Sequence, residues 1–216
     1  MAQTVSFLFD FISPYSYLAS QRIDRDPTLH TLSWVDVPVV LGTMLSRRGV
    51  QGPGEIPIRR RRQLEDVLLL CRHFGFPFEG PPTHPFNSIY ALRSVVAIED
   101  LRVRRAFVQA CFEAAWARGQ DLSDPTVVAA CGTQVGLTID PVALASEPAL
   151  RRTLKENTAE ALERGAWGVP TFLIDDLLFF GHDRLPLVAS YLNGHIALDR
   201  DKLEDLLTRP QPGRII

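Results

Sequence analysis

Apolar residues at the start of the chain follow a pattern that predicts a strand and then a helix. Residues 4–9 alternate and then run apolar in valine, leucine and phenylalanine, a composition typical of a buried strand. Ser13 and Pro14 form a helix-start signal, because the serine oxygen accepts from free N–H groups and proline fits the first helical position. We expect this helix to reach about Arg25 and a second strand to span residues 32–37, which makes a right-handed βαβ unit.

The middle of the chain, from residue 57 to 164, shows almost no strand signal and several helical periods. Apolar side chains recur three and four residues apart, first at Leu64, Val67, Leu68, Cys71 and Phe74 and then at Val95, Ile98 and Leu101. A further apolar helical face spans residues 107–117. Polar residues followed by proline at 124–125, 140–141 and 147–148 predict three more helix starts. This part of the chain is expected to be entirely helical.

After residue 165 the pattern returns to strands. Residues 169–174 and 177–180 are short apolar runs separated by two aspartates, which predicts a β-hairpin. Two further helices are expected at residues 185–192 and near residues 199–207. The predicted order is therefore βαβ, a helical block, and ββα.

This order of elements predicts an α/β protein in which one domain interrupts another. Residues 1–56 and 165–216 contain the predicted strands, so we expect them to form one discontinuous domain. Residues 57–164 are expected to form an inserted helical domain within it.

The composition is that of a globular protein with a sizeable core. The chain has 216 residues, of which 46% are hydrophobic, and 23 lysines and arginines against 25 acidic residues give a formal net charge of −2. This near-neutral balance argues against a nucleic-acid partner. The chain contains neither a basic N-terminal segment before an apolar run nor 18 uncharged apolar residues together. We expect a cytoplasmic protein without a membrane association.

The cysteines argue against several kinds of chemistry. Cys71, Cys111 and Cys131 are odd in number and far apart, and none has a second cysteine or a histidine at a metal-binding or CxxC spacing. We therefore expect no disulfide framework, no metal site and no cysteine redox motif. Their places on apolar helical faces predict inert core residues.

Three short segments carry a resemblance to a known family. They are Asp-Phe-Ile-Ser-Pro-Tyr-Ser-Tyr-Leu at residues 10–18, Gly-Val-Pro-Thr-Phe at 168–172, and Phe-Gly-His-Asp-Arg at 180–184. Together with the order of elements, they resemble a thioredoxin-like fold with the helical insertion of the DsbA group. Within that group the chain is similar to the bacterial 2-hydroxychromene-2-carboxylate isomerases and to the kappa-class glutathione transferases.

This resemblance implies a function that depends on glutathione. Ser13 and Ser16 stand where the two cysteines of a CPxC redox motif would stand. The resemblance implies a homodimeric isomerase that uses glutathione as cofactor and a small aromatic carboxylate as substrate, and that interconverts cis and trans isomers by reversible thiolate addition. Two alternatives stay open: a kappa-like glutathione transferase or peroxidase, and a redox-inactive thioredoxin relative that binds thiols or peptides.

Ser13 is the expected catalytic residue. A serine before Pro14 is by itself a helix N-cap. In the functional interpretation its hydroxyl donates to the thiolate of bound glutathione, and the helix N-terminus, with about half a positive charge, lowers the pKa of that thiol. Tyr15 is expected at the substrate, although it can also serve only for packing.

The other two segments supply the expected contacts to glutathione. By resemblance, Pro170 is a cis-proline, and the backbone of Val169 pairs with the cysteinyl part of glutathione. His182 and Asp183 are expected to hold the γ-glutamyl end, although an aspartate there can also be a plain helix cap. The family often has a small polar residue where this chain has His182.

Two further contacts are implied where the match is weaker. Alignment with the family places Arg59 at a basic position that meets a glutathione carboxylate, and places Val50 where relatives have an asparagine, so a side-chain contact is expected to be lost. The run of arginines at 59–62 can equally be a solvated helix face. Asn87 is expected to orient the substrate, or else only to cap the next helix.

Overall fold

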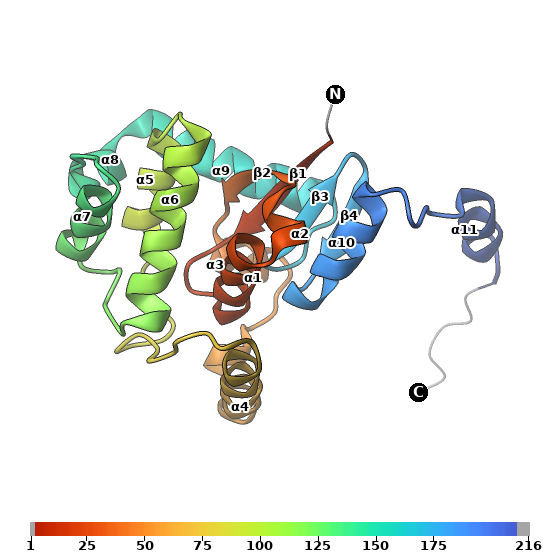
Figure 1. Ribbon diagram of the computed structural model, residues 1–216, viewed down its shortest axis with the longest axis horizontal. Coiled ribbons are helices and arrows are strands. Elements are labelled where there is room, and N and C mark those ends of the chain that lie inside the picture. Colours follow the sequence, from red (N-terminus) through yellow and green to blue (C-terminus); the bar gives the residue numbers. More distant parts are fainter. Residues whose placement is uncertain (1–2, 211–216) are drawn as a thin grey trace.

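The protein is described here by a computed structural model, which covers residues 3–210, and a four-stranded mixed sheet lies at its centre (Figure 1). The strand order is β2-β1-β3-β4. The strands are β1 (Thr4–Phe9), β2 (Ser33–Pro38), β3 (Thr171–Ile174) and β4 (Leu177–Phe180). β1 pairs in parallel with β2 and antiparallel with β3, and β3 and β4 form the predicted hairpin. The central strand β1 therefore pairs with one strand from the N-terminal part of the chain and one from the C-terminal part.

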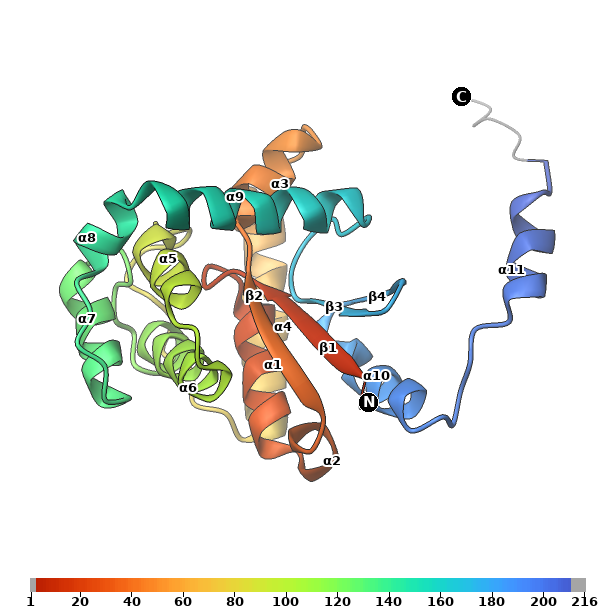
Figure 2. The same cartoon turned by 90° about the horizontal axis from the view of Figure 1, so that it is seen from above.

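Helices cover both faces of this sheet (Figure 2). The helices of the βαβ unit are α1 (Pro14–Arg25) and α2 (Pro27–His30), and α3 (Leu41–Arg47) follows β2. A 3₁₀ turn at His182–Arg184 precedes α10 (Leu185–Leu192), and α11 (Arg200–Leu207) is the last helix of the described part. Alternate residues of β1 point to opposite faces, so Phe7 packs in the core below α1 and Leu8 in a smaller core with α3 and the C-terminal end of α9.

Residues 57–164 are helical, as predicted. They contain α4 (Pro57–Phe74), α5 (Ile89–Ala97), α6 (Leu101–Phe112), a π-helical turn (Glu113–Ala117), α7 (Pro125–Gln134), α8 (Pro141–Ser146) and α9 (Pro148–Glu163). The helix starts predicted at 125, 141 and 148 are confirmed.

The structure corrects three details of the sequence-based expectations. The helical period that seemed to continue to Leu101 is broken, because α5 ends at Ala97 and α6 begins at Leu101. Asp100 caps α6, since its carboxylate accepts from the N–H groups of Arg102 and Val103. The helix expected at 107–117 is the second half of α6 together with the π-helical turn. Leu68, expected on the buried face of α4, is 54% exposed.

An aromatic cluster joins the sheet to the helical block. The ring centroids of Phe9 and Phe112 lie 5.5 Å apart, and those of Phe11 and Phe112 lie 4.8 Å apart. Phe112 ends α6, whereas Phe9 and Phe11 lie at the end of β1 and just after it. The strand-containing part and the helical block therefore share one hydrophobic core.

A buried ionic cluster joins the same two parts. Arg105 of α6 binds Asp24 of α1 at 2.7 Å and Asp36 of β2 at 2.8 Å, and also donates to the carbonyl of Ser20. Burial raises the pKa of Asp36, and the Arg105 guanidinium opposes that shift. A buried carboxylate is stable only beside such a partner, so Arg105 is a structural residue of the junction.

Candidate functional site

Ser13 lies at the junction of β1 and α1 and faces a segment from the other end of the chain. The side chain is the N-cap of α1, since its Oγ accepts from the N–H of Ser16 at 3.2 Å. The same Oγ donates to the carbonyl of Val169 at 3.3 Å. Ser13 is 4% exposed. The structural role expected for Ser13 is thus confirmed, and its hydroxyl also points to the segment expected to contact glutathione.

The Val169 segment is held in place from two sides. The Val169–Pro170 peptide bond is cis, as expected from the resemblance. The carbonyl of Pro170 accepts from the N–H of Gly181 at 2.9 Å, which ties the start of β3 to the His182–Arg184 turn. Within residues 3–210 the N–H of Val169 has no hydrogen-bond partner. The three segments singled out in the sequence therefore meet at one place.

His182 and Tyr15 form one wall of this place. Their rings stack in parallel, with centroids 5.5 Å apart. His182 is 9% exposed, its carbonyl accepts from the guanidinium of Arg22 at 2.8 Å, and its Nδ1 has no partner among residues 3–210. Burial and the nearby Arg22 charge lower the pKa of His182, so its ring is neutral at neutral pH.

Tyr15 connects this wall to α4. Its hydroxyl donates to the carboxylate of Asp66 at 2.8 Å. Partial burial and the neighbouring Asp66 raise the pKa of Tyr15, so the phenol stays protonated and acts as a hydrogen-bond donor. Asp66 was not predicted as a site residue, because only the packing of α4 against the start of α1 brings it to Tyr15.

An open cavity of about 460 Å³ lies beside Tyr15. It is lined by Tyr15, Pro53, Ile58, Arg59, Arg62, Gln63 and Asp66. Arg59 makes no ion pair with any residue from 3 to 210, whereas Arg61 and Arg62 both bind Glu65. Of the two arginines that line the cavity, Arg59 and Arg62, only Arg59 is without an ion pair among the described residues.

The remaining expected residues lie at the surface. Asp183 is exposed and pairs loosely with Arg184 at 3.7 Å, and its turn has no side-chain cap, so the alternative of a plain helix cap is not observed. Asn87 is exposed, and its Oδ1 accepts from the N–H of Ile89 at 3.1 Å, as in the capping alternative. Asn87 does not line the cavity beside Tyr15. Val50 is 51% exposed.

The loop before Ser13 is held by four side chains that were not predicted as site residues. The carboxylate of Asp10, which is 1% exposed, accepts from Ser88 Oγ at 2.7 Å and from the N–H groups of Leu41 and Ile12 at 2.9 and 3.2 Å. Burial raises the pKa of Asp10, and these hydrogen bonds oppose the shift. His84 Nε2 donates to the carbonyl of the residue before Ser13, and Trp116 Nε1 to the carbonyl one residue earlier, both at 2.8 Å.

The sequence offered one signal for these contacts. Asp10 is a polar residue directly after an apolar strand, and it belongs to the first segment of the resemblance. Its partner Ser88 and the rings of His84 and Trp116 come from the helical block, so no local pattern pointed to them. The helical block thus fixes the conformation of the loop that presents Ser13.

A family model described as the DSBA-like thioredoxin domain matches residues 4–193 of the chain. The chain belongs to this family. The predicted fold, a thioredoxin-like sheet with a DsbA-type helical insertion, is therefore confirmed.

Within the DSBA-like family, this chain is similar to two groups of enzymes. It is 28% identical over 196 residues to a 2-hydroxychromene-2-carboxylate isomerase of Sphingobium xenophagum, covering 89% of this chain and 99% of that protein. It is also 28% identical over 208 residues to glutathione S-transferase kappa 2 of Caenorhabditis elegans, covering 88% and 92%. The resemblance seen in the sequence is confirmed for both groups.

Solved structures support the same fold. The structure of a 2-hydroxychromene-2-carboxylate isomerase covers 94% of this DSBA-like chain and 98% of its own, with a TM-score of 0.80 and 24% identity. The cytosolic disulfide reductase DsbM from Pseudomonas aeruginosa with GSH covers 90% and 100%, with a TM-score of 0.63 and 20% identity. No helix within residues 3–210 has both the length and the apolar character needed to cross a membrane.

The chemistry of this DSBA-like site differs from that of a cysteine redox centre. Serine stands at positions 13 and 16, at the start of α1. Cys71, Cys111 and Cys131 are buried in the helical block, and burial raises the pKa of Cys71 to about 11. The N-terminus of α1 still offers free N–H groups and a partial positive charge. The site can therefore stabilise a thiolate, but the protein supplies none there.

Proposed function

We propose that the protein is a glutathione-dependent isomerase of aromatic oxo acids of the 2-hydroxychromene-2-carboxylate type, active as a cytoplasmic homodimer. One observation carries the proposal: Ser13, and not a cysteine, caps α1 and faces the carbonyl that precedes a cis-proline. The similarity to enzymes of this name and to kappa-class glutathione transferases supports it.

The residues at the site fit glutathione. The unpartnered N–H of Val169 and its carbonyl would pair with the cysteinyl backbone, as in the addition of a short strand. The Ser13 hydroxyl, held by Val169 at the long distance of 3.3 Å, would turn to a thiolate, which is the stronger acceptor. Arg59, which has no ion pair within residues 3–210, would bind a carboxylate of the peptide.

The γ-glutamyl end would lie at the His182–Arg184 turn. The exposed carboxylate of Asp183 would bind its ammonium group, and the unpartnered Nδ1 of the neutral His182 offers a hydrogen bond in the same region. Val50 has no polar side-chain atom, so the loop that carries it adds no side-chain hydrogen bond.

The cavity beside Tyr15 would take the aromatic substrate. Bound glutathione would supply a thiolate that adds reversibly to the conjugated double bond, which permits rotation about the resulting single bond. Tyr15 would contact the substrate with its ring and keep its phenol protonated. Asn87 lies outside the lining of this cavity, so we propose that it contacts the part of the substrate that extends beyond the cavity. It would do so through its amide N–H groups, because only its oxygen is used, in the hydrogen bond from the N–H of Ile89.

Ser13→Ala tests this assignment. A hydrogen bond to a charged group contributes about 1.5–3 kcal/mol, so its loss should raise the pKa of bound glutathione by about 1–2 units. The pKa is measured by titrating the ultraviolet absorbance of the thiolate in the complex. Ser16→Ala is the matched control, since Ser16 Oγ is buried and has no partner among the described residues. An unchanged titration in Ser13→Ala would refute the role of Ser13.

The kappa-class relatives favour a second candidate function, conjugation of glutathione to electrophiles. The two activities use the same activated thiolate and differ in whether it leaves the product. Isomerisation of 2-hydroxychromene-2-carboxylate that requires glutathione without consuming it supports the isomerase. Consumption of glutathione with an electrophile, and no isomerisation, supports the transferase. Binding without either reaction indicates a binding module, and no binding of glutathione overturns the whole scheme.

A further inference from the structure

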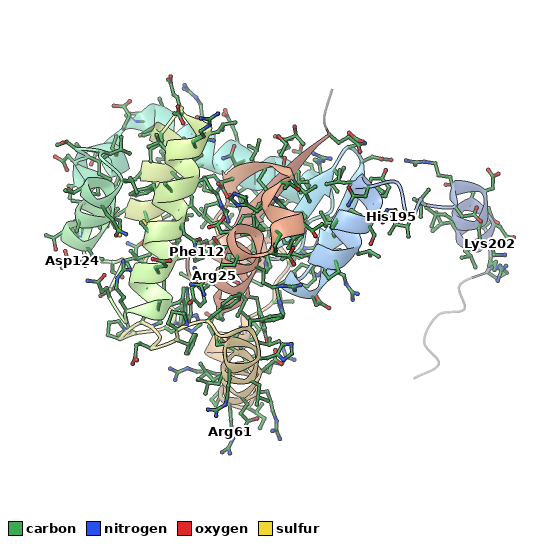
Figure 3. The ribbon with its side chains drawn as sticks, viewed as in Figure 1. Arg25, Arg61, Phe112, Asp124, His195 and Lys202 are labelled. Carbon is green, nitrogen blue, oxygen red and sulfur yellow. The ribbon has the colours of Figure 1, made fainter. Side chains whose placement is uncertain are left out.

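The C-terminal arm, by which we mean residues 193–210 after α10, extends away from the rest of the described chain. α11 lies apart from the other helices in both orientations, and Lys202 marks it in the view with side chains (Figures 1, 2 and 3). α11 buries no residue within the described chain. Leu203, Leu206 and Leu207 recur three and four residues apart and therefore share one face of α11, with exposed fractions of 36%, 47% and 57%. Such a face is typical of a helix that packs against a partner.

A second apolar surface lies near the base of this arm. Trp167, Phe180 and Leu187 are 46%, 37% and 44% exposed, and the rings of Trp167 and Phe180 lie 5.0 Å apart. They line a groove of about 550 Å³ between β4 and α10, together with Ile196 and Leu198 at the root of the arm. We call these three residues the Trp167 surface. β4 is the last strand of the sheet, so nothing in residues 3–210 pairs with its outer edge.

One ion pair helps to hold the arm in its extended position. Arg200, the first residue of α11, binds Asp176 in the turn between β3 and β4 at 2.9 Å. The leucine face of α11 and the Trp167 surface therefore belong to the same chain and lie in the same region, yet each remains exposed to solvent. Apolar surfaces of this kind on a soluble protein mark sites of interaction.

We propose that two copies of this chain exchange their arms, so that the leucine face of α11 in each copy packs against the Trp167 surface of the other. A two-fold arrangement covers both surfaces of both copies with no third component. Its contacts combine leucines with large aromatic side chains, and aromatic side chains are enriched at the centres of interfaces. The proposal names the contact surface of a homodimer and does not depend on the reaction that the protein catalyses.

Charge complementarity supports the same pairing. By helical spacing, Glu204 lies beside Leu207 at the edge of the leucine face, and it makes no ion pair within residues 3–210. Arg184 lines the groove of the Trp167 surface, is 54% exposed, and has only a 3.7 Å pair with its neighbour Asp183. Exchange of the arms would bring the free acid of one copy to the weakly paired guanidinium of the other.

The test measures the mass of the full chain in solution by sedimentation. The unchanged protein should be a dimer at micromolar concentration. Leu206→Glu combined with Leu207→Glu changes only exposed side chains, so the circular dichroism spectrum should stay the same while the dimer dissociates at least tenfold more readily. Leu187→Glu on the Trp167 surface should have the same effect. Asp201→Ala, on the opposite face of α11, is the control and should leave the dimer intact.

Mixing the two kinds of variant distinguishes exchange from any other dimer. A chain with a defective arm still has an intact Trp167 surface, and a chain with Leu187→Glu still has an intact arm. Their mixture should therefore form one complete contact and recover part of the association that each variant lacks alone. A monomeric unchanged protein, a dimer that tolerates the arm substitutions, or a mixture that recovers no association would each overturn the proposal.

Discussion

Replacement of Arg105 by methionine tests whether the buried ionic cluster holds the helical block to the sheet. The substitution keeps an apolar chain of similar length and removes the guanidinium that binds Asp24, Asp36 and the Ser20 carbonyl. Asp36, whose side chain is 2% exposed, then lies buried without a counter-charge. Breaking a buried ion pair from one side costs about 3–5 kcal/mol, whereas the partly solvated Asp24 should add less than about 1 kcal/mol.

The stability lost in Arg105→Met should depend on pH in a definite direction. Burial already raises the pKa of Asp36, and loss of Arg105 removes the main effect that lowers it. An acid whose pKa is raised by folding contributes stability at low pH that is lost as pH rises above its unfolded value, about 3.9. The deficit of Arg105→Met relative to the unchanged protein should therefore be smaller near pH 5 than at neutral pH.

The measurement is urea unfolding followed by circular dichroism at both pH values. Arg102→Met is the matched control, because Arg102 lies on the same helix, is exposed, and makes no ion pair within residues 3–210, so its effect should stay within about 0.5 kcal/mol. Adding Asp36→Asn to Arg105→Met removes the buried charge and should recover at least half of the loss. A loss below about 1 kcal/mol for Arg105→Met, or no recovery in the double variant, would refute the reasoning.

Three further substitutions are expected to affect stability. Asp10→Asn should lower the free energy of unfolding by about 1–3 kcal/mol, because it replaces one of the two acceptor oxygens by an NH2 group that cannot accept. Ser88→Ala, which removes only one of the donors, should cost about 1 kcal/mol, and a larger loss for Ser88→Ala than for Asp10→Asn in urea unfolding would contradict this. Burial lowers the pKa of His182 and of His84, so their contribution to stability is present above about pH 6.5 and falls as pH drops through that value. His182→Phe should flatten the loss of stability between about pH 6.5 and 5, and an unchanged slope would argue against it.

The parts of the fold that were predictable are those with a local cause. The bounds of β1 follow from its apolar run, and the start of α1 follows from Ser13 and Pro14. The break before α6 was missed because Asp100 caps that helix without a following proline, and an apolar period alone does not show the interruption. Leu68 fits the period of α4 but is exposed, because periodicity shows which residues share a face and not how much of that face finds a partner.

The candidate site also has a part that the sequence predicts and a part that it does not. The three segments recognised by resemblance do come together, and the stacking of Tyr15 on His182 shows why the third of them faces the first. Asp66 and Ser88 could not be predicted, because their contacts to Tyr15 and Asp10 join residues 51 and 78 positions apart. Such contacts depend on how α4 and α5 dock, which no pattern within either helix specifies.

The strand order affects how the protein can fold during its synthesis on the ribosome. β1 lies between β2, which is made directly after it, and β3, which begins about 130 residues after β2 ends. At roughly 5–20 residues per second, one edge of β1 waits on the order of ten seconds for its partner. The helices of the insertion emerge during that interval and can bury Phe9 and Phe11 against Phe112 before the sheet is complete. The insertion therefore buries the apolar side chains of β1 early and protects the nascent strand from aggregation. A chain that ends within the insertion would be released with those side chains exposed.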